Sequence, residues 1–262
     1  MSRYLKLLKI FWSAALQTEL EYRLNFVANA LLSVFWLVWA ALGVGVYFRF
    51  GESVNGWSYP ELLVVMGWFF AVNGLRQAVI QPNLGRMTEY VRMGTLDFVL
   101  TKPIDSQFLV SFRHLGIYNL MDPVLGIGLM VAALIWRGEP VGPIDVAAWT
   151  VLGAAALAVV YALAVGIQSL ALWAIGGESL DDLLQGVVEA GRFPVQMYRG
   201  FVRALLTFAL PVAVMTTFPV EALLGRTTPQ LIFVVSLVAI AAVLSAGLVW
   251  RFSLRHYRGA SA

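Results

Sequence analysis

The chain has 262 residues, of which 60% are hydrophobic and only 13% are charged, and its formal net charge is +3. Soluble domains carry about 25% charged residues, so the composition argues against a soluble fold. Because the chain contains no cysteine, disulfides, zinc–thiolate sites and thiol catalysis are excluded.

The amino-terminal segment, residues 1–24, has the pattern of an amphipathic helix. Polar residues such as Lys6, Lys9 and Gln17 recur at three- or four-residue steps or their multiples, and apolar residues fill much of the rest. Such a helix suits the inner surface of a membrane. We therefore predict an elbow helix here, with the cytoplasmic start of a long first span as the alternative.

Six long apolar stretches follow. A hydrocarbon core of about 30 Å needs roughly 20 apolar helical residues. The predicted spans are residues 26–48, 60–81, 115–136, 146–177, 204–220 and 230–250. The fourth is longer than one crossing requires, and the fifth is short and interrupted by Pro211 and Pro219. The pattern predicts an all-α membrane protein with six transmembrane helices in a single domain, residues 1–262.

Lysine and arginine are distributed unevenly between the two sides that this map defines. With both termini inside, the cytoplasmic segments hold Arg3, Lys6, Lys9, Arg23, Arg86, Arg92, Lys102, Arg113, Arg192, Arg199, Arg203, Arg251, Arg255 and Arg258. The outer loops hold Arg49, Arg137 and Arg226. This positive-inside pattern predicts a multi-pass protein of the cell inner (cytoplasmic) membrane with both termini cytoplasmic.

A polar insert after the second span, within residues 82–108, has the features of two short helices. Asn83 can cap the first helix, and Gly94 can end it in the left-handed conformation. Thr95 can cap a second helix over residues 96–100. A loop that only joined two spans could be much shorter. Its length and order indicate a docking surface, with a helix lying on lipid as the alternative.

Two sequence runs carry a family resemblance. Residues 94–103, GTLDFVLTKP, resemble the Gly-x-Leu-x-x-x-Leu-x-Lys-Pro segment of type-2 ABC exporter permeases. Residues 193–201, FPVQMYRGF, followed by residues 210–212 and 218–225, form a second match. The resemblance covers essentially the whole chain, and the chain is similar more narrowly to a bacterial subfamily of uncharacterised ABC-type permeases.

The resemblance implies an elbow helix, a cytoplasmic docking helix after span two and re-entrant helices between spans five and six, here over residues 210–229. A proline-kinked fifth span is the alternative at that last place. Residues 178–200 are then a second cytoplasmic loop. The candidate ATPase-docking residues are Arg86, Glu89, Arg92, Leu96, Asp97, Phe98 and Lys102. The implied partners are an ABC-type ATPase subunit and a second permease, identical or homologous, because six spans form half of the usual pathway.

The three lysines, Lys6, Lys9 and Lys102, all lie outside any phosphate-binding Gly-x-x-x-x-Gly-Lys-Ser/Thr motif. We therefore expect ATP and Mg in the partner ATPase, with no cofactor and no catalytic residue in this chain. The predicted function is the permease subunit of an ATP-driven exporter that forms its pathway as a dimer, with membrane lipid but no nucleic acid as a partner.

Two other functions were weighed. The membrane coupling subunit of an ABC importer would also show docking helices, but it would lack the broken segment between spans five and six. An intramembrane enzyme needs a cluster of acids, histidines or arginines at one depth, and this chain offers one acid and one arginine. The cargo is not identified by the sequence.

Polar residues inside the predicted spans form one further expectation. Arg76 and Asp122 lie roughly 8 and 10 Å from the inner boundary at about 1.5 Å per helical residue. Asn73 and Asn119 lie one turn away on the same faces. We predict an Arg76–Asp122 pair that either fixes helix packing or contacts cargo; the alternative is that Arg76 extends alone to the inner headgroups.

No metal site is expected. His114 and His256 are far apart in the sequence, near inner membrane boundaries. The acids after the fourth span are Glu178, Asp181, Asp182 and Glu189, and neither histidine nor cysteine joins them. Their spacing is that of the solvated face of a short helix.

Overall fold

The computed structural model describes residues 2–21, 23–49, 53–172 and 180–257. Within these ranges the chain is helical apart from its turns and connections, with one isolated β-bridge between Val54 and Trp57. The predicted all-α class is therefore confirmed for the described residues. Glu178, Arg258 and the end of the predicted fourth span lie outside them.

Six long helices form the framework: α1 Ser2–Glu21, α2 Arg23–Tyr47, α3 Tyr59–Leu75, α8 Met121–Arg137, α9 Pro143–Ser169 and α13 Pro229–His256. The short helices are α4 Gln81–Leu84, α5 Met87–Arg92, α6 Leu96–Leu100, α7 Ser106–Phe112, α10 Leu180–Glu189, α11 Gly200–Ala204 and α12 Phe218–Leu223. In the described residues, five helical stretches are long and apolar enough to cross a membrane, or six if one bent pair counts as a span.

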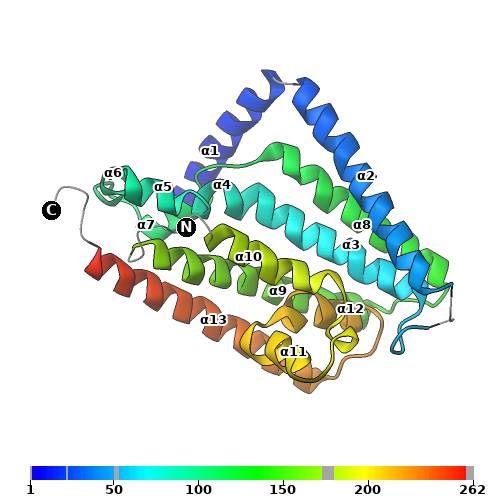
Figure 1. Cartoon of the computed structure of the whole chain (residues 1–262). Coiled ribbons are helices and arrows are strands. Elements are labelled where there is room, and N and C mark those ends of the chain that lie inside the picture. The colour runs from blue at the N-terminus through cyan, green and yellow to red at the C-terminus, as the bar shows by residue number, and fades with distance from the viewer. Residues whose placement is uncertain (1, 22, 50–52, 173–179, 258–262) are drawn as a thin grey trace.

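The centre of the molecule is α3, which lies between the other long helices (Figure 1). It packs backbone to backbone on α8, because glycines face each other. A Cβ atom added to Gly126 would lie 2.4 Å from the carbonyl oxygen of Gly67, and one added to Gly74 would lie 2.4 Å from Cδ of Pro123. Small residues of this kind allow close helix contact inside membranes. A second layer is formed by α9 against α13.

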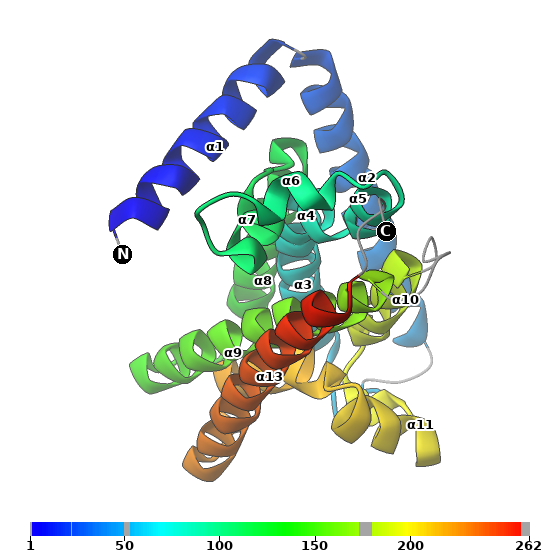
Figure 2. The same ribbon diagram turned by 90° about the vertical axis from the view of Figure 1, so that its left-hand side faces the viewer.

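The two amino-terminal helices stand away from this centre and meet at a steep angle (Figures 1 and 2). Only 6% of the apolar window of α2 is buried in the chain. The start of α1 returns to the short helices α5–α7, where the rings of Tyr4 and Phe108 are 4.7 Å apart. There Nη2 of Arg3 also donates a hydrogen bond to the carbonyl of Pro103 (3.4 Å). The amino-terminal helix therefore contacts the predicted docking loop.

The chain after α9 does not follow the predicted path. Residues 178–200 were expected as a loop at the docking-loop end and residues 204–220 as the fifth span. Instead, residues 180–197 lie along α3 from one end to the other. Three contacts mark this path: Gln81 with Asp181 beyond the last turn of α3, Phe69 with Arg192 in its middle, and Asn55 with Gln196 just before its start. The fifth passage through the molecule is therefore made by residues 180–197.

This passage has no strong sequence signal. Helix α10 is short and carries Asp181 and Asp182 in its first turn, so no apolar stretch of span length exists there. Its apolar residues Leu184, Val187 and Val188 are nevertheless buried. The opposite face, with Asp182, Leu183 and Gly186, is exposed, so α10 is amphipathic and lacks the uniformly apolar surface by which the spans were predicted.

A bent helix pair follows at the end of the molecule opposite the docking loop (Figure 1). The stretches Gly200–Ala209 and Ala213–Leu223 are bent by 73° at the break that contains Pro211. The second stretch is buried, and Oγ1 of its Thr217 accepts a hydrogen bond from the amide of Val195 (3.1 Å). Nε1 of Trp68 in α3 also donates a hydrogen bond to the carbonyl of Met215 in this stretch (3.0 Å). Surrounding protein thus satisfies part of the irregular backbone, as it must within a membrane.

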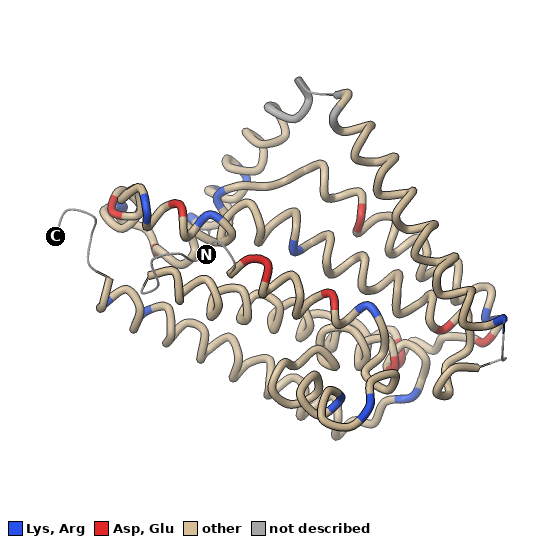
Figure 3. The backbone as a smooth tube through the Cα atoms, viewed as in Figure 1, with Lys and Arg blue, Asp and Glu red and all other residues tan. Residues whose placement is uncertain are grey.

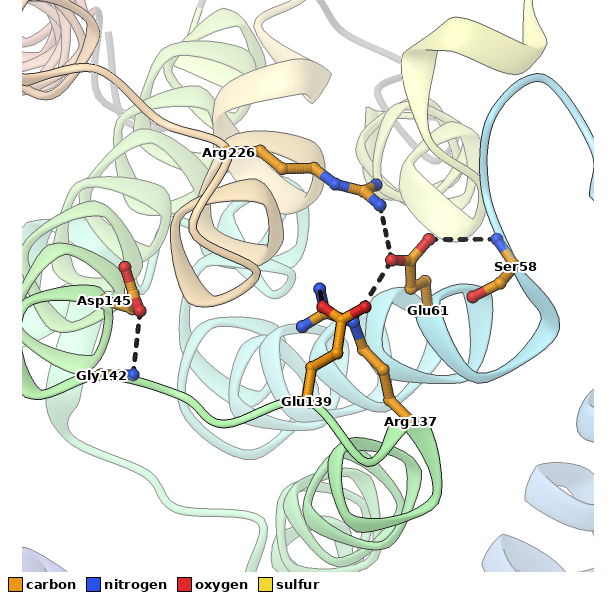
Figure 4. A network of polar contacts seen from close by, with 7 residues as sticks. All are labelled: Ser58, Glu61, Arg137, Glu139, Gly142, Asp145 and Arg226. Carbon is orange, nitrogen blue, oxygen red and sulfur yellow. Dashed lines mark hydrogen bonds and ion pairs between the residues drawn. The ribbon is translucent and has the colours of Figure 1, made fainter.

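A polar cluster ties the elements together at this far end (Figure 4). The carboxylate of Glu61, only 5% exposed, lies 2.5 Å from Nη2 of Arg226 and 3.4 Å from Nε of Arg137. Its other oxygen accepts a hydrogen bond from the amide of Ser58 (3.0 Å). One acid thus joins the start of α3 to the end of α8 and to the loop before α13.

Charged residues gather mostly towards the two ends of the molecule, with long uncharged stretches between them (Figure 3). The path of residues 180–197 moves Arg199 and Arg203, which were expected inside, to the far end. The docking-loop end keeps the larger group of basic residues, which includes Arg86, Arg92 and Lys102. Basic residues therefore remain more numerous at the docking-loop end, which the positive-inside rule assigns to the cytoplasm. The difference between the two ends is smaller than the sequence predicted.

Candidate functional site

The insert between α3 and α8 folds as a compact group of short helices at one end of the molecule (Figure 2). After α3, the π-helical turn Arg76–Ile80 and α4 lead into α5. Gly94 adopts φ +68°, the left-handed conformation predicted for it, and turns the chain from α5 into α6. Helix α6 covers Leu96–Leu100, the same range as the prediction.

The base of this group is apolar and fully packed. Met87 and Leu96 have 0% exposure, and Val99 has 6%. Helix α5 lies against α9 and the short helical turn Leu170–Leu172. Leu96, which was proposed as a docking residue, is therefore an anchor that fixes α6 to the rest of the chain. It is not available to a partner.

The tip of the group presents apolar side chains to the outside. Phe98 is 72% exposed, Met93 is 60% exposed and Leu100 is 36% exposed. The candidate residues Arg86, Glu89, Arg92 and Lys102 are exposed around them, and Asp97 is half-buried. An exposed aromatic residue ringed by charges, on a base that is rigidly packed, has the composition of a protein-binding surface.

Asn83 has a different role from the predicted helix cap. It is 1% exposed and lies inside α4, where Nδ2 donates to the carbonyl of His114 (2.7 Å) and Oδ1 accepts from the amide of His114 (2.8 Å). These two bonds clamp the entry of the docking loop to its exit. Burial, with the charges of Arg113 and Arg86, lowers the pKa of His114. Its ring is therefore neutral at pH 7.

The second predicted cap is also corrected. Thr95 precedes α6, but its side chain makes no capping hydrogen bond. The cap that forms belongs to α7, where Oδ1 of Asp105 accepts from the amide of Phe108 (2.8 Å). Tyr257, the last residue that the structure describes, lies next to this group: burial and the nearby carboxylate of Asp97 raise its pKa. Both ends of the described chain therefore contact the docking loop.

A buried polar network connects the start of the loop to α10. Arg76 is 3% exposed, and its guanidinium donates from Nε to Oδ1 of Asn73 (3.1 Å) and from Nη1 to Oε1 of Gln81 (2.9 Å). Nη2 donates to Gln185 of α10. Gln81, the first residue of α4, in turn donates to Asp181. This network was not predicted, because α10 was expected outside the span region.

The predicted Arg76–Asp122 pair is not formed. The two spans are neighbours as expected, since Gly74 of α3 lies against Asp122 and Pro123 of α8. Arg76 points to the opposite side, however, towards α10. The carboxylate of Asp122 lies beside Ser33 of α2, and its Oδ1 is buried without a hydrogen-bond partner. The two residues thus lie at similar levels along neighbouring helices, as expected. The direction in which each side chain points was not predicted.

The remaining candidate, Asn119, forms a hydrogen bond with the backbone. Its Nδ2 donates to the carbonyl of Gln77 (3.0 Å) in the π-helical turn. In the described ranges, no group of three or more histidine, aspartate or glutamate side chains could hold a metal ion.

The fold and this surface define a class: an all-helical membrane protein with a packed group of short helices, exposed at its tip, between its second and third spans. The comparison with protein families gives the particular group. The profile described as ABC-2 family transporter protein matches residues 34–261, so the chain belongs to that family. No curated protein and no solved structure matches the chain.

Proposed function

We propose that this chain is the membrane-spanning permease subunit of an ATP-driven ABC exporter. Family membership supports a permease of an ABC transporter. The single observation that carries the coupling role is the surface around Phe98, which is exposed on α6 while Leu96 and Val99 fix the same helix to the core. A separate ATPase subunit, which binds ATP and Mg, docks there.

The direction of transport is argued from the far end. An importer-type coupling subunit would also present docking helices, and it is the second candidate function. The 73° bend between Gly200–Ala209 and Ala213–Leu223 favours export, because it supplies the broken segment before the last span that an importer would lack. We assign this segment as re-entrant, α1 as the elbow helix, and both termini to the cytoplasm of a cell whose inner membrane holds the protein. Two permease chains, identical or homologous, form the pathway.

The network around Arg76 supports a route for coupling. Gln81 opens the docking loop and is bonded to Arg76 and to Asp181 of α10. A displacement of the loop by the ATPase is therefore transmitted to the passage formed by residues 180–197. Packed helices move as rigid elements, so a short displacement at one end reaches the other.

The test is co-purification of the chain with the ATPase of its native complex. Phe98→Asp places a charge at the centre of the apolar tip, and Asp97→Arg reverses the adjacent charge. Both variants should insert normally and lose the ATPase. The matched control is Ile144→Asp, since Ile144 is 83% exposed in the first turn of α9 at the far end. Retention of the ATPase by both α6 variants would disprove the docking assignment.

A further inference from the structure

A groove between α2 and residues 192–198 differs in chemistry from the rest of the membrane-facing surface. Two cavities lie end to end in it, one of about 290 Å³ and one of about 230 Å³. The rings of Tyr47 and Phe193 line both cavities, with centroids 6.4 Å apart. Trp39 lines the deeper cavity and Tyr198 lines the one near the far end. Four aromatic rings thus line the groove, among walls that are otherwise mostly aliphatic.

One charge lies in this groove. Arg192 lines the deeper cavity, and its guanidinium carbon is 5.9 Å from the centroid of the Phe69 ring. Phe69 is ten residues along α3 from Tyr59, which places Arg192 about 15 Å from that end at about 1.5 Å per residue. A membrane core is about 30 Å thick. Arg192 therefore lies near the middle of the bilayer.

Arg192 has no counter-charge among the residues that the structure describes. Its Nε is shielded from solvent and has no hydrogen-bond acceptor. The nearest acid in sequence, Glu189, instead accepts a hydrogen bond from Nε2 of Gln185 (2.9 Å). An ionised side chain at this depth is costly and is usually functional. The contrast with Arg76 is direct, since three side-chain oxygens surround that guanidinium.

These features define the kind of ligand that the groove can bind. An anionic group supplies the charge that Arg192 lacks, and guanidinium groups bind carboxylates and phosphates well. An apolar body fits along the Tyr47 and Phe193 rings, which line both cavities, towards Asn55. The two cavities together fall within the range of about 300–1,000 Å³ that is usual for small-molecule sites. A cation would meet the positive charge, and a fully apolar molecule would leave it unpaired.

We propose that this groove binds an amphipathic organic anion, with its acidic group on Arg192 and its apolar body along the Tyr47 and Phe193 rings. Such molecules are then the cargo class of the transporter. The cargo role rests on the proposed function, whereas the binding site does not, because no ATPase is needed to occupy it.

The test is fluorescence quenching in the purified, full-length chain. Trp39 lines the site, so a brominated ligand bound there quenches its emission. The probes are 11-bromoundecanoic acid and 11-bromoundecan-1-ol at pH 8, which differ in charge and share their chain. We expect the acid to bind at least tenfold more tightly than the alcohol. Because Trp39 is 63% exposed, probe dissolved in detergent also quenches it, equally for the acid and the alcohol. The saturable part of the quenching, which differs between the two probes and which Trp39→Phe should lose, reports the site.

The charge is tested by substitution. Arg192→Gln should weaken acid binding about tenfold and leave alcohol binding unchanged, whereas Arg192→Lys should keep the preference for the acid. Arg203→Gln is the matched control, because Arg203 is exposed at the end of α11. Equal binding of the acid and the alcohol to the unmodified chain would overturn the proposal, and this comparison stands even if Arg192→Gln fails to fold.

The cargo role has its own readout. Undecanoic acid should raise ATP hydrolysis by the intact complex, and Arg192→Gln should abolish the increase. Binding of the acid without such stimulation would reject the cargo role while confirming the site. Loss of the ATPase in the Phe98 experiment does not affect the quenching result, so failures of the two proposals are distinguishable.

Discussion

Arg76 and Asp122 are two buried polar residues in adjacent helices with separate surroundings. Hydrogen bonds that involve a charged group contribute about 1.5–3 kcal/mol each. Arg76→Gln loses several of them, so we expect it to lower the free energy of unfolding by at least about 2 kcal/mol. Asp122→Asn should be neutral or stabilising, because the carboxylate lacks a cationic partner within the described residues and its Oδ1 is unsatisfied. Thermal unfolding of the purified chain measures both.

The double variant decides whether the two residues interact. Because Arg76 bonds to Asn73, Gln81 and Gln185, the two effects should add within about 0.5 kcal/mol, as they do for independent sites. A recovery of stability in the double variant would mean that the side chains form the direct pair that the sequence predicted.

His114 gives the docking loop a pH dependence. Its pKa is lowered in the folded state, so below the unfolded value of about 6.5 the unfolded chain binds the extra proton more readily. Stability should therefore be full above pH 7 and fall as the pH is lowered through about 6.5. His114→Gln should remove this component and flatten the profile of melting temperature against pH between 7 and 5.5. An unchanged profile would mean that the ring stays protonatable in the fold.

Helices α3 and α8 pack closely against each other. Substitutions of two glycines of α8 test this packing, because they should change stability in opposite directions. A Cβ at position 126 would lie 2.4 Å from the carbonyl oxygen of Gly67, whereas one at position 128 would meet nothing within 4 Å. Gly126→Ala should therefore destabilise the chain by about 1–3 kcal/mol through overpacking. Gly128→Ala should stabilise the helix by about 0.5–1 kcal/mol. Equal effects in thermal unfolding would refute the close approach of the two helices.

At the level of the whole molecule, the passage of residues 180–197 fixes the topology. It places Arg199 at the far end, while the sequence pattern placed it inside. The chain has no native cysteine, so Arg199→Cys should react with a membrane-impermeant maleimide added to intact cells. Gly94→Cys, in the docking loop, should stay protected. Protection of both positions would restore the sequence-based map, with its fifth span over residues 204–220.

The sequence predicted the parts of the fold that follow from apolar length and from local turn chemistry. The long helices and the left-handed Gly94 are of this kind. It did not predict the passage of α10, because this helix is short and buries only one apolar face, so no apolar stretch of span length marks it. The sequence also did not predict the hydrogen-bond partners of Arg76 and Asn83. These depend on helix rotation and on contacts between distant segments, which composition does not encode.

The burial of α3 also has a consequence for how the protein is made. The helical stretch Tyr59–Arg92, which begins with α3, has 72% of its apolar window buried and a mean hydropathy of 1.5, against 2.7 for Pro229–His256, and it carries Glu61 and Arg76. Insertion into a bilayer favours segments that are apolar on every side. As the ribosome delivers it, this stretch is apolar enough to span a membrane by itself, but its glycine face meets its partner only when α8 emerges. We therefore expect the final packing of α3 to form late in biosynthesis, after α8 has entered the lipid beside it.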